Sequence, residues 1–276
     1  MRKLAIPALL LTALPVQAAV TLDAQTREVS FDSLRTVTEA ICITPQSCTV
    51  ISQTTTPDAD TETAPGFDPF SAALSSSIFP SVAVSQESTI KPFRMQAHAS
   101  HEAAGAASLG QIGGLPPTFV ETIDEHETRS LYRVEFTLDE PTGFLLDGTI
   151  VGGGAGFIGD LDMQIALRHA NGDVIHRIAL EDDDNCFGDP GCSDLGPLSL
   201  FESGTLAPGS YVLEAEIHGH TGAFVSFQFG AIANAHTGSF DVDLQLGQTV
   251  PLPPFVAPVL ALGLAVLARR PLARAR

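Results

Sequence analysis

A short acidic loop holds the residues of this sequence whose chemistry is easiest to name. The stretch EDDDNCFGDPGCSD, residues 181–194, carries six carboxylates within fourteen residues. Carboxylate and backbone carbonyl oxygens are the ligands that Ca²⁺ prefers in proteins. The candidate calcium ligands are Asp182, Asp184 and Asp189. The EF-hand pattern is not met, because Cys186 stands at a ligand position and Phe187 where that loop needs glycine. A solvated acidic loop without a metal is the alternative.

A glycine motif resembles a cofactor-binding fingerprint. Gly154, Gly156 and Gly159 in GGGAGFIGD match G-x-G-x-x-G, which in dinucleotide-binding folds follows a strand and opens a helix. The residues after Gly159 alternate between apolar and polar with a period of two, so a strand follows rather than a helix. We interpret the motif as a glycine-rich connection between strands.

Two histidine motifs fall short of a metal site. HASHEAAG has Gly105 where a zinc-protease helix needs its second histidine. His218 and His220 in HGHTG share one face of a predicted strand. They could be a solvated pair or a pair of metal ligands, and the sequence leaves both interpretations open. The sequence has no G-x-S-x-G nucleophile elbow. We therefore predict no catalytic residue.

Four cysteines form two close pairs with identical spacing. Cys42 and Cys48 are separated by five residues, as are Cys186 and Cys192, and each intervening loop contains a proline. In an exported chain this spacing predicts two local disulfides. A four-cysteine zinc site is the alternative, although its usual pairs are separated by two to four residues.

The elements that position these motifs are predicted to be β-strands. Apolar and polar residues alternate over 132–138, 161–167, 211–217, 225–229 and 240–246. Strict alternation indicates strands with one buried face, which is typical of antiparallel sheets packed face to face. Asn171-Gly172 and the stretch LAPGSY at 206–211 mark tight turns between strands. The predicted fold is all-β, an antiparallel β-sandwich of about seven strands.

The chain divides by composition into four parts. Residues 1–18 are predicted to be a signal peptide, because Arg2 and Lys3 precede an apolar stretch and a small-residue cleavage site. Residues 19–90 form an N-terminal region with the first disulfide and a Ser/Thr/Pro-rich linker at 52–77. The β-sandwich is assigned to 91–249, with a flexible stretch at 100–117, and 250–276 is the tail.

The body of the chain, without its two ends, is more acidic than the whole chain. The whole chain has a formal net charge of −18, but the ends contain six of its 14 basic residues and no acid. The remaining body has 8 basic and 32 acidic residues, a net charge of −24. Such a surface repels phosphate backbones, which excludes nucleic acid as an expected partner.

The tail combines a proline motif, an apolar run and arginines. Val250-Pro251-Leu252-Pro253 precedes the run at 255–268, which Arg269 and Arg270 follow. This order resembles the VPLPA variant of the PEP-CTERM sorting signal, with Pro254 where that family usually has alanine. The resemblance implies an exosortase, a membrane-embedded protease, as partner. Fourteen residues make a helix of roughly 21 Å, which is marginal for a bilayer of about 30 Å. The resemblance also implies that the protease removes the tail, so the tail is expected to hold the membrane only transiently.

The body resembles the jelly-roll-like sandwich of exported PEP-CTERM-type proteins. The resemblance rests on FTLDEPTGFLLDGTI, on SGTLAPGSYVLEAEI and on a last strand that runs into the proline motif. We therefore expect a non-enzymatic protein of the cell envelope or extracellular matrix, exported through the inner membrane, with a binding or structural role linked to exopolysaccharide. The alternative is a secreted hydrolase that acts on glycans, since two carboxylates suffice for that chemistry. No cofactor other than calcium is expected.

Overall fold

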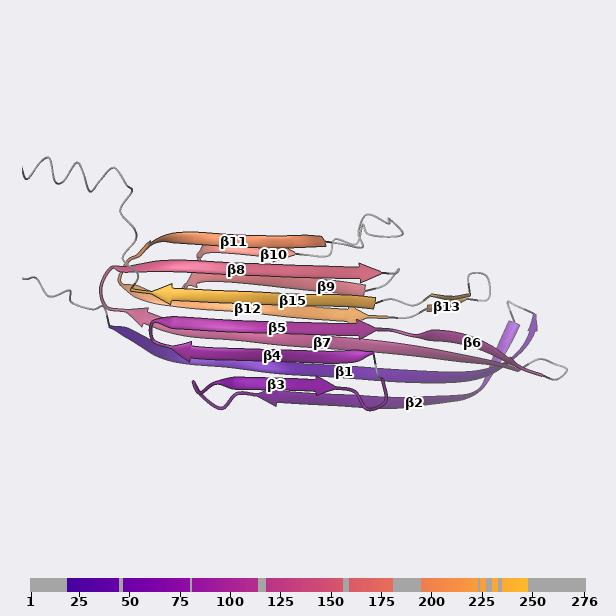
Figure 1. Cartoon of the computed structure of the whole chain (residues 1–276). Coiled ribbons are helices and arrows are strands. Elements are labelled where there is room, and N and C mark those ends of the chain that lie inside the picture. The colour runs from indigo at the N-terminus through magenta and orange to yellow at the C-terminus, as the bar shows by residue number, and fades with distance from the viewer. Residues whose placement is uncertain are drawn as a thin grey trace, which may run out of the picture.

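The computed structural model (Figure 1) describes residues 19–44, 47–79, 81–113, 118–155, 159–180, 195–222, 224–226, 230–232 and 235–247. The strands within these residues are β1 (Val20–Thr44), β2 (Ser47–Thr63), β3 (Phe70–Ser75), β4 (Val82–Lys91), β5 (Arg94–Ala104), β6 (Ala107–Ile112), β7 (Thr118–Leu138), β8 (Thr142–Ala155), β9 (Gly159–His169), β10 (Val174–Leu180), β11 (Leu195–Leu206), β12 (Gly209–Thr221), β13 (Phe224–Ser226), β14 (Gly230–Ile232) and β15 (Ala235–Leu246). None of the described residues belongs to a helix long and apolar enough to cross a membrane.

Two antiparallel sheets pack face to face. The seven-stranded sheet has the order β10-β9-β12-β7-β1-β2, with β6 paired to one end of β7. The six-stranded sheet has the order β11-β8-β15-β5-β4-β3, and β13 and β14 form a separate pair. Some neighbouring strands are consecutive hairpins, such as β4 and β5, and others come from distant parts of the chain, such as β5 and β15. The predicted all-β, jelly-roll-like sandwich is confirmed, whereas the predicted C-terminal helix lies outside the described residues.

The core follows the predicted alternation. Tyr132, Val134, Phe136 and Leu138 of β7 all point inward and are almost completely buried. They belong to a large apolar cluster to which both sheets contribute. Burial of each such side chain stabilises the fold by about 1.5–3 kcal/mol relative to exposure. Their outward neighbours are polar, as an antiparallel sheet with one solvated face requires.

A second, smaller apolar cluster lies on β1, β3, β4, the connection between β3 and β4, and the end of β5. It includes Val29, Phe31, Phe79 and Val84. Buried polar groups also occur in this part of the sandwich, for example Gln86 of β4, whose Nε2 donates to the carbonyl of Leu131 on β7 at 3.0 Å. Such bonds tie the two sheets together and satisfy groups that would otherwise be costly to bury.

The seven-stranded sheet extends beyond the six-stranded one. Beyond the end of β12, β6 pairs with 118–123 of β7, while β1 and β2 continue alongside to the disulfide. We call this extension (residues 34–44, 47–57, 107–112 and 118–125) the arm. Figure 1 shows it running past the end of β5.

Three expectations about organisation are wrong. The predicted linker at 52–77 contains most of β2 and all of β3, and the predicted flexible stretch at 100–117 contains the end of β5 and all of β6. Position 90 is no boundary either, because the β4–β5 hairpin spans it. The Ser/Thr-rich stretch shows no apolar alternation because β2 is an edge strand whose side chains are exposed. Such a strand needs no apolar face, and threonine favours the strand conformation.

Candidate functional site

The outer face of the six-stranded sheet carries aligned rows of polar side chains. The strand register places Thr89, Gln96, Asp243 and Asp147 side by side across β4, β5, β15 and β8. Phe201 of β11 continues the row, because it is the register partner of Asp147. Side chains opposite one another in an antiparallel ladder lie about 5 Å apart, so the row is a continuous surface.

A shallow groove follows this row and the next one. The groove is lined by carboxylates, hydroxyls, an amide and one imidazole: Glu87, Thr89, Gln96, His98, Asp147, Thr149, Asp241 and Asp243. We call it the acidic groove. Its side chains stand on four paired strands, so the backbone that positions them is held by sheet hydrogen bonds rather than by a loop.

Two carboxylates of the acidic groove already have polar partners. Arg94 donates from Nε and Nη2 to Asp243 at 3.1 and 2.8 Å. This hydrogen-bonded pair raises the pKa of Arg94. His98 Nδ1 lies 2.8 Å from an oxygen of Asp241. Glu87 and Asp147 also line the groove, which therefore remains rich in negative charge.

An exposed aromatic ring stands at one end of the row. Phe201 is 68% exposed, the highest value among the exposed large hydrophobic side chains of the described residues. Exposure of an aromatic ring beside a polar groove is a feature of ligand sites, where apolar contact area and a few polar groups act together.

A second shallow groove adjoins the first on the same face. Its floor is formed by small side chains, among them Ser85, Ser100 and Ser239. The hydroxyls of Ser85 and Ser100 are hydrogen-bonded at 2.8 Å. Apolar side chains, such as Val151, also line this second groove, so it is less polar than the first.

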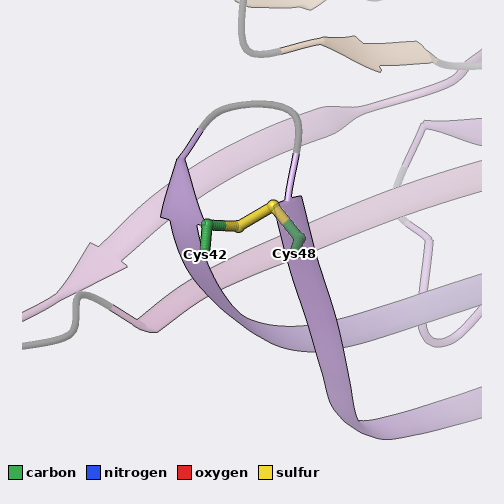
Figure 2. The surroundings of a disulfide bond; sticks show 2 residues. All are labelled: Cys42 and Cys48. Carbon is green, nitrogen blue, oxygen red and sulfur yellow. A yellow bond between two sulfur atoms is a disulfide. The ribbon is translucent and has the colours of Figure 1, made fainter.

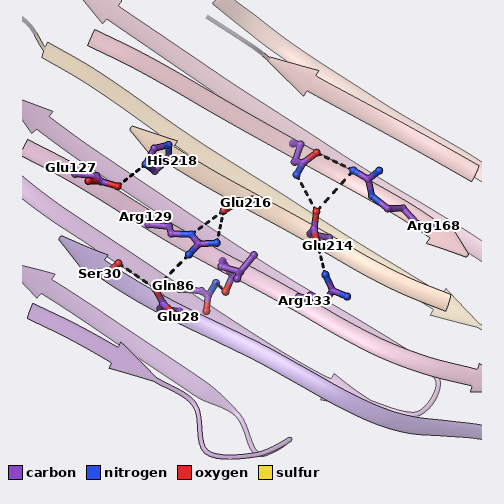
Figure 3. Close-up of polar contacts among 12 residues, drawn as sticks. Glu28, Ser30, Gln86, Glu127, Arg129, Arg133, Arg168, Glu214, Glu216 and His218 are labelled. Carbon is purple, nitrogen blue, oxygen red and sulfur yellow. Dashed lines mark hydrogen bonds and ion pairs between the residues drawn. The ribbon is translucent and has the colours of Figure 1, made fainter. Parts of the chain in front are cut away.

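The outer face of the seven-stranded sheet is different, because its charges pair with one another (Figure 3). Arg129 lies 2.9 Å from Glu216, and Arg133 lies 3.4 Å from Glu214, which also accepts from Gln164. Half-exposed pairs of this kind each contribute about 0–1 kcal/mol. Several charges of this face are thus already paired, and it carries no exposed aromatic ring like that of Phe201 among the described residues, so the acidic groove is the better candidate for a ligand.

One predicted disulfide is present. Cys42 and Cys48 are bonded across the end of the β1–β2 hairpin, at the tip of the arm (Figure 2). The two residues are register partners in the ladder, so the five-residue spacing closes a hairpin. Cys186 and Cys192 lie outside the described residues, and their pairing stays a prediction.

Several other predicted site residues also lie outside the described part of the chain. These are the candidate calcium ligands Asp182, Asp184 and Asp189, and the sorting motif Val250, Pro251, Leu252 and Pro253. Among the described residues, no group of three or more His, Cys, Asp or Glu side chains is placed to hold a metal ion.

The histidine motifs lie on strands, and the glycine motif runs from the end of one strand to the start of the next. β8 ends at Ala155 and β9 begins at Gly159, so the glycine motif connects a strand of one sheet to a strand of the other, as interpreted from the sequence. His101 of HASHEAAG lies on β5 rather than on a helix. His218 lies on the outer face of β12, with Nε2 2.9 Å from Glu127.

The sequence reasoning missed two sets of residues. One is the acidic groove with Phe201, which depends on register between strands far apart in the chain. The other is a group of buried histidines, His101, His126 and His236. The signal for the second set was available, because each of these histidines is in phase with the inward residues of its own strand.

Comparisons with known proteins assign no family. No protein-family model matches the chain, and no curated protein matches it. Among solved structures, the infectious bursal disease virus VP2 subviral particle is 9% identical, with a TM-score of 0.20, covering 92% of this chain and 75% of that one. The Gx strain structure of the same virus is 7% identical, with a TM-score of 0.18, covering 91% and 76%. Scores this low carry no argument about fold or function.

Proposed function

We propose that this protein is an exported, non-enzymatic protein of the cell envelope or extracellular matrix that binds exopolysaccharide. The observation that carries the proposal is the acidic groove with Phe201 beside it. Hydroxyl, amide and carboxylate groups suit the hydroxyls of a glycan, and the ring of Phe201 suits the apolar C–H face of a sugar. A flat, four-strand surface also suits an extended polymer better than a small enclosed ligand.

The charge of the acidic groove limits the kind of glycan. Four carboxylates face one imidazole and the guanidinium of Arg94. Like charges brought together disfavour binding. We therefore expect a neutral or amine-bearing polysaccharide, and we expect a uronate-rich one to be rejected.

The disulfide at the tip of the arm supports export. Disulfides persist in oxidising compartments and are rare in the cytosol. Export and sorting themselves rest on the signal-peptide pattern of residues 1–18 and on the tail at 250–276. Intact-mass measurement of the native protein tests both, and we expect a mature chain that lacks the first 18 residues and the tail beyond the proline motif. A native chain that ends at Arg276 would contradict sorting.

Glycan binding is tested by co-sedimentation of the mature protein with insoluble neutral, amine-bearing and uronate-rich polysaccharides. We expect retention by the first two classes, and loss of most of it in Phe201→Ala. Ile51→Ala is the matched control, since Ile51 is a similarly exposed apolar residue on the arm. Equal retention of wild type and Phe201→Ala would refute the assignment of this site.

A hydrolase remains the second candidate, and one observation favours it. Asp147 and Asp243 are register partners, so two carboxylates stand side by side as glycosidase chemistry requires. Asp243 is already bonded to Arg94, which is why we place binding first. The test is release of reducing ends from the polysaccharides in the panel. If wild type releases them and Asp147→Asn does not, hydrolysis rather than binding is the function of this site.

A further inference from the structure

Three histidines are buried between the sheets near the root of the arm. His101 of β5 is 3% exposed, His236 of β15 is 4% exposed and His126 of β7 is 1% exposed. The rings of His101 and His236 are 4.7 Å apart. The proposed glycan binding uses none of the three, because they point into the sandwich.

Two glycines make the space that the rings occupy. A Cβ on Gly219 of β12 would lie 2.3 Å from Nε2 of His236, and a Cβ on Gly238 of β15 would lie 2.6 Å from Nε2 of His101. Contacts this short do not occur, so any other residue at either position displaces an imidazole. The two strands are therefore shaped around these side chains.

The hydrogen bonding of this pair is incomplete. Thr128 Oγ1 lies 3.0 Å from Nδ1 of His101 and 3.4 Å from Nε2 of His236, and it donates to the carbonyl of Gly219. The remaining nitrogens, Nε2 of His101 and Nδ1 of His236, have no hydrogen-bond partner among the described residues. A proton added to either ring would bring a charge into a buried space that offers no acceptor to these two nitrogens, which disfavours the charged form.

The surrounding groups do not compensate such a charge. His218 and His220 of β12 lie near the pair on the opposite face of their strand and oppose protonation in the same sense. The nearest buried acid is Asp124 of β7, and Arg35 of β1 already binds both of its oxygens, at 2.7 and 2.8 Å.

Burial is the main cause of the resulting shifts. It lowers the pKa of His101 well below its ordinary value, with His236 and His218 adding to the effect. Burial and the neighbouring histidines lower the pKa of His236 to about 4. Burial also lowers the pKa of His126, although Asp124 and the backbone of Ala104 act against it.

We propose that His101, His126 and His236 form an acid-sensitive latch, which holds the two sheets together at the arm end when neutral and lets them separate there when protonated. The large apolar cluster at the other end stays closed at the same pH. Acidification of the surroundings would then change the root of the arm while the acidic groove keeps its shape.

The sign of the pH dependence follows from the lowered values. An unfolded histidine takes up its proton near pH 6.5, whereas the folded protein resists it, so the unfolded state binds more protons between these limits. Stability is therefore full above about pH 6.5 and falls as the pH drops toward 4. For His236 alone, lowering the pH from 7.5 to 5.0 raises the unfolding constant about 30-fold.

The test is urea unfolding of the mature protein at pH values from 7.5 to 5.0. We expect the free energy of unfolding of wild type to fall between pH 7.5 and pH 5.0, as just described. We expect His101→Gln/His236→Gln, compared with its own stability at pH 7.5, to show little of this fall. His98→Gln is the matched control, since His98 lies on the same strand as His101 but faces solvent. If the double variant does not fold, His236→Gln alone is measured.

Hydrogen exchange then tests where opening begins. At pH 5.0 we expect peptides covering 100–104 and 235–239 to lose protection before peptides covering 142–147 and 209–214, which lie at the pole away from the arm. An unchanged slope in the histidine variant, or simultaneous loss of protection at both ends, would overturn the latch.

Discussion

Replacing Gly219 with alanine is a direct test of the packing between the two sheets. The added Cβ would meet Nε2 of His236 at 2.3 Å and Cε1 of His101 at 2.8 Å, and both rings are buried. Overpacking of this kind costs about 1–3 kcal/mol. Alanine regains about 0.5–1 kcal/mol, because glycine loses more backbone freedom on folding. The net expectation is a loss of about 1–2 kcal/mol, which for a domain of this size lowers the Tm by roughly 2–8 °C.

Gly154→Ala is the matched control for that experiment. Gly154 also lies in a strand, and a Cβ there would meet only the carbonyl of Ala235 at 3.5 Å, an ordinary contact. This variant should gain a few tenths of a kcal/mol, up to about 1. The assay is urea unfolding at pH 7.5, followed by far-UV circular dichroism because the chain has no tryptophan. If Gly219→Ala proves as stable as Gly154→Ala, β12 is not packed against the histidine rings as described.

Two further variants probe other features. Arg27 is 1% exposed and donates to the carbonyl of Gly66 and to Ser88 Oγ, so Arg27→Met should leave that carbonyl unpaired and cost about 1–3 kcal/mol in urea unfolding. An unchanged or increased stability would mean that apolar packing alone replaces the guanidinium. The double variant Cys42→Ser/Cys48→Ser should lose about 2 kcal/mol by loop-closure entropy, read from the urea midpoint, and equal midpoints would show that the arm opens independently of the sandwich.

The sequence predicted those parts of the fold where one face of a strand is buried. Tyr132, Val134 and Phe136 alternate with charged residues because their sheet has a core side and a solvent side. The turn at Asn171-Gly172 was also predicted from the sequence, and Gly172 has the positive φ of 97° that such a turn requires. Local rules were sufficient for these elements.

The same rules failed where neighbours distant in sequence decide the structure. β2 has exposed side chains, and its pairing comes from β1, so its own composition resembled a linker. The acidic groove combines residues from β4, β5, β8 and β15, and only the register of the finished sheet brings them together. Polar residues at inward positions interrupt an apolar pattern, and His101 was weighed only as part of the zinc-protease motif HASHEAAG.

The two ends of the described body leave the molecule at the same pole. Val20, at the start of β1, pairs with Leu138, and Leu246, at the end of β15, pairs with Phe144. β1 runs from that pole to the disulfide hairpin, and its 25 residues span roughly 80 Å at about 3.3 Å per residue. The disulfide hairpin and the paired ends of β6 and β7 therefore lie at the pole opposite Leu246. If the tail that follows Leu246 held the protein at a surface, the arm would lie at the end of the described body far from the point of attachment.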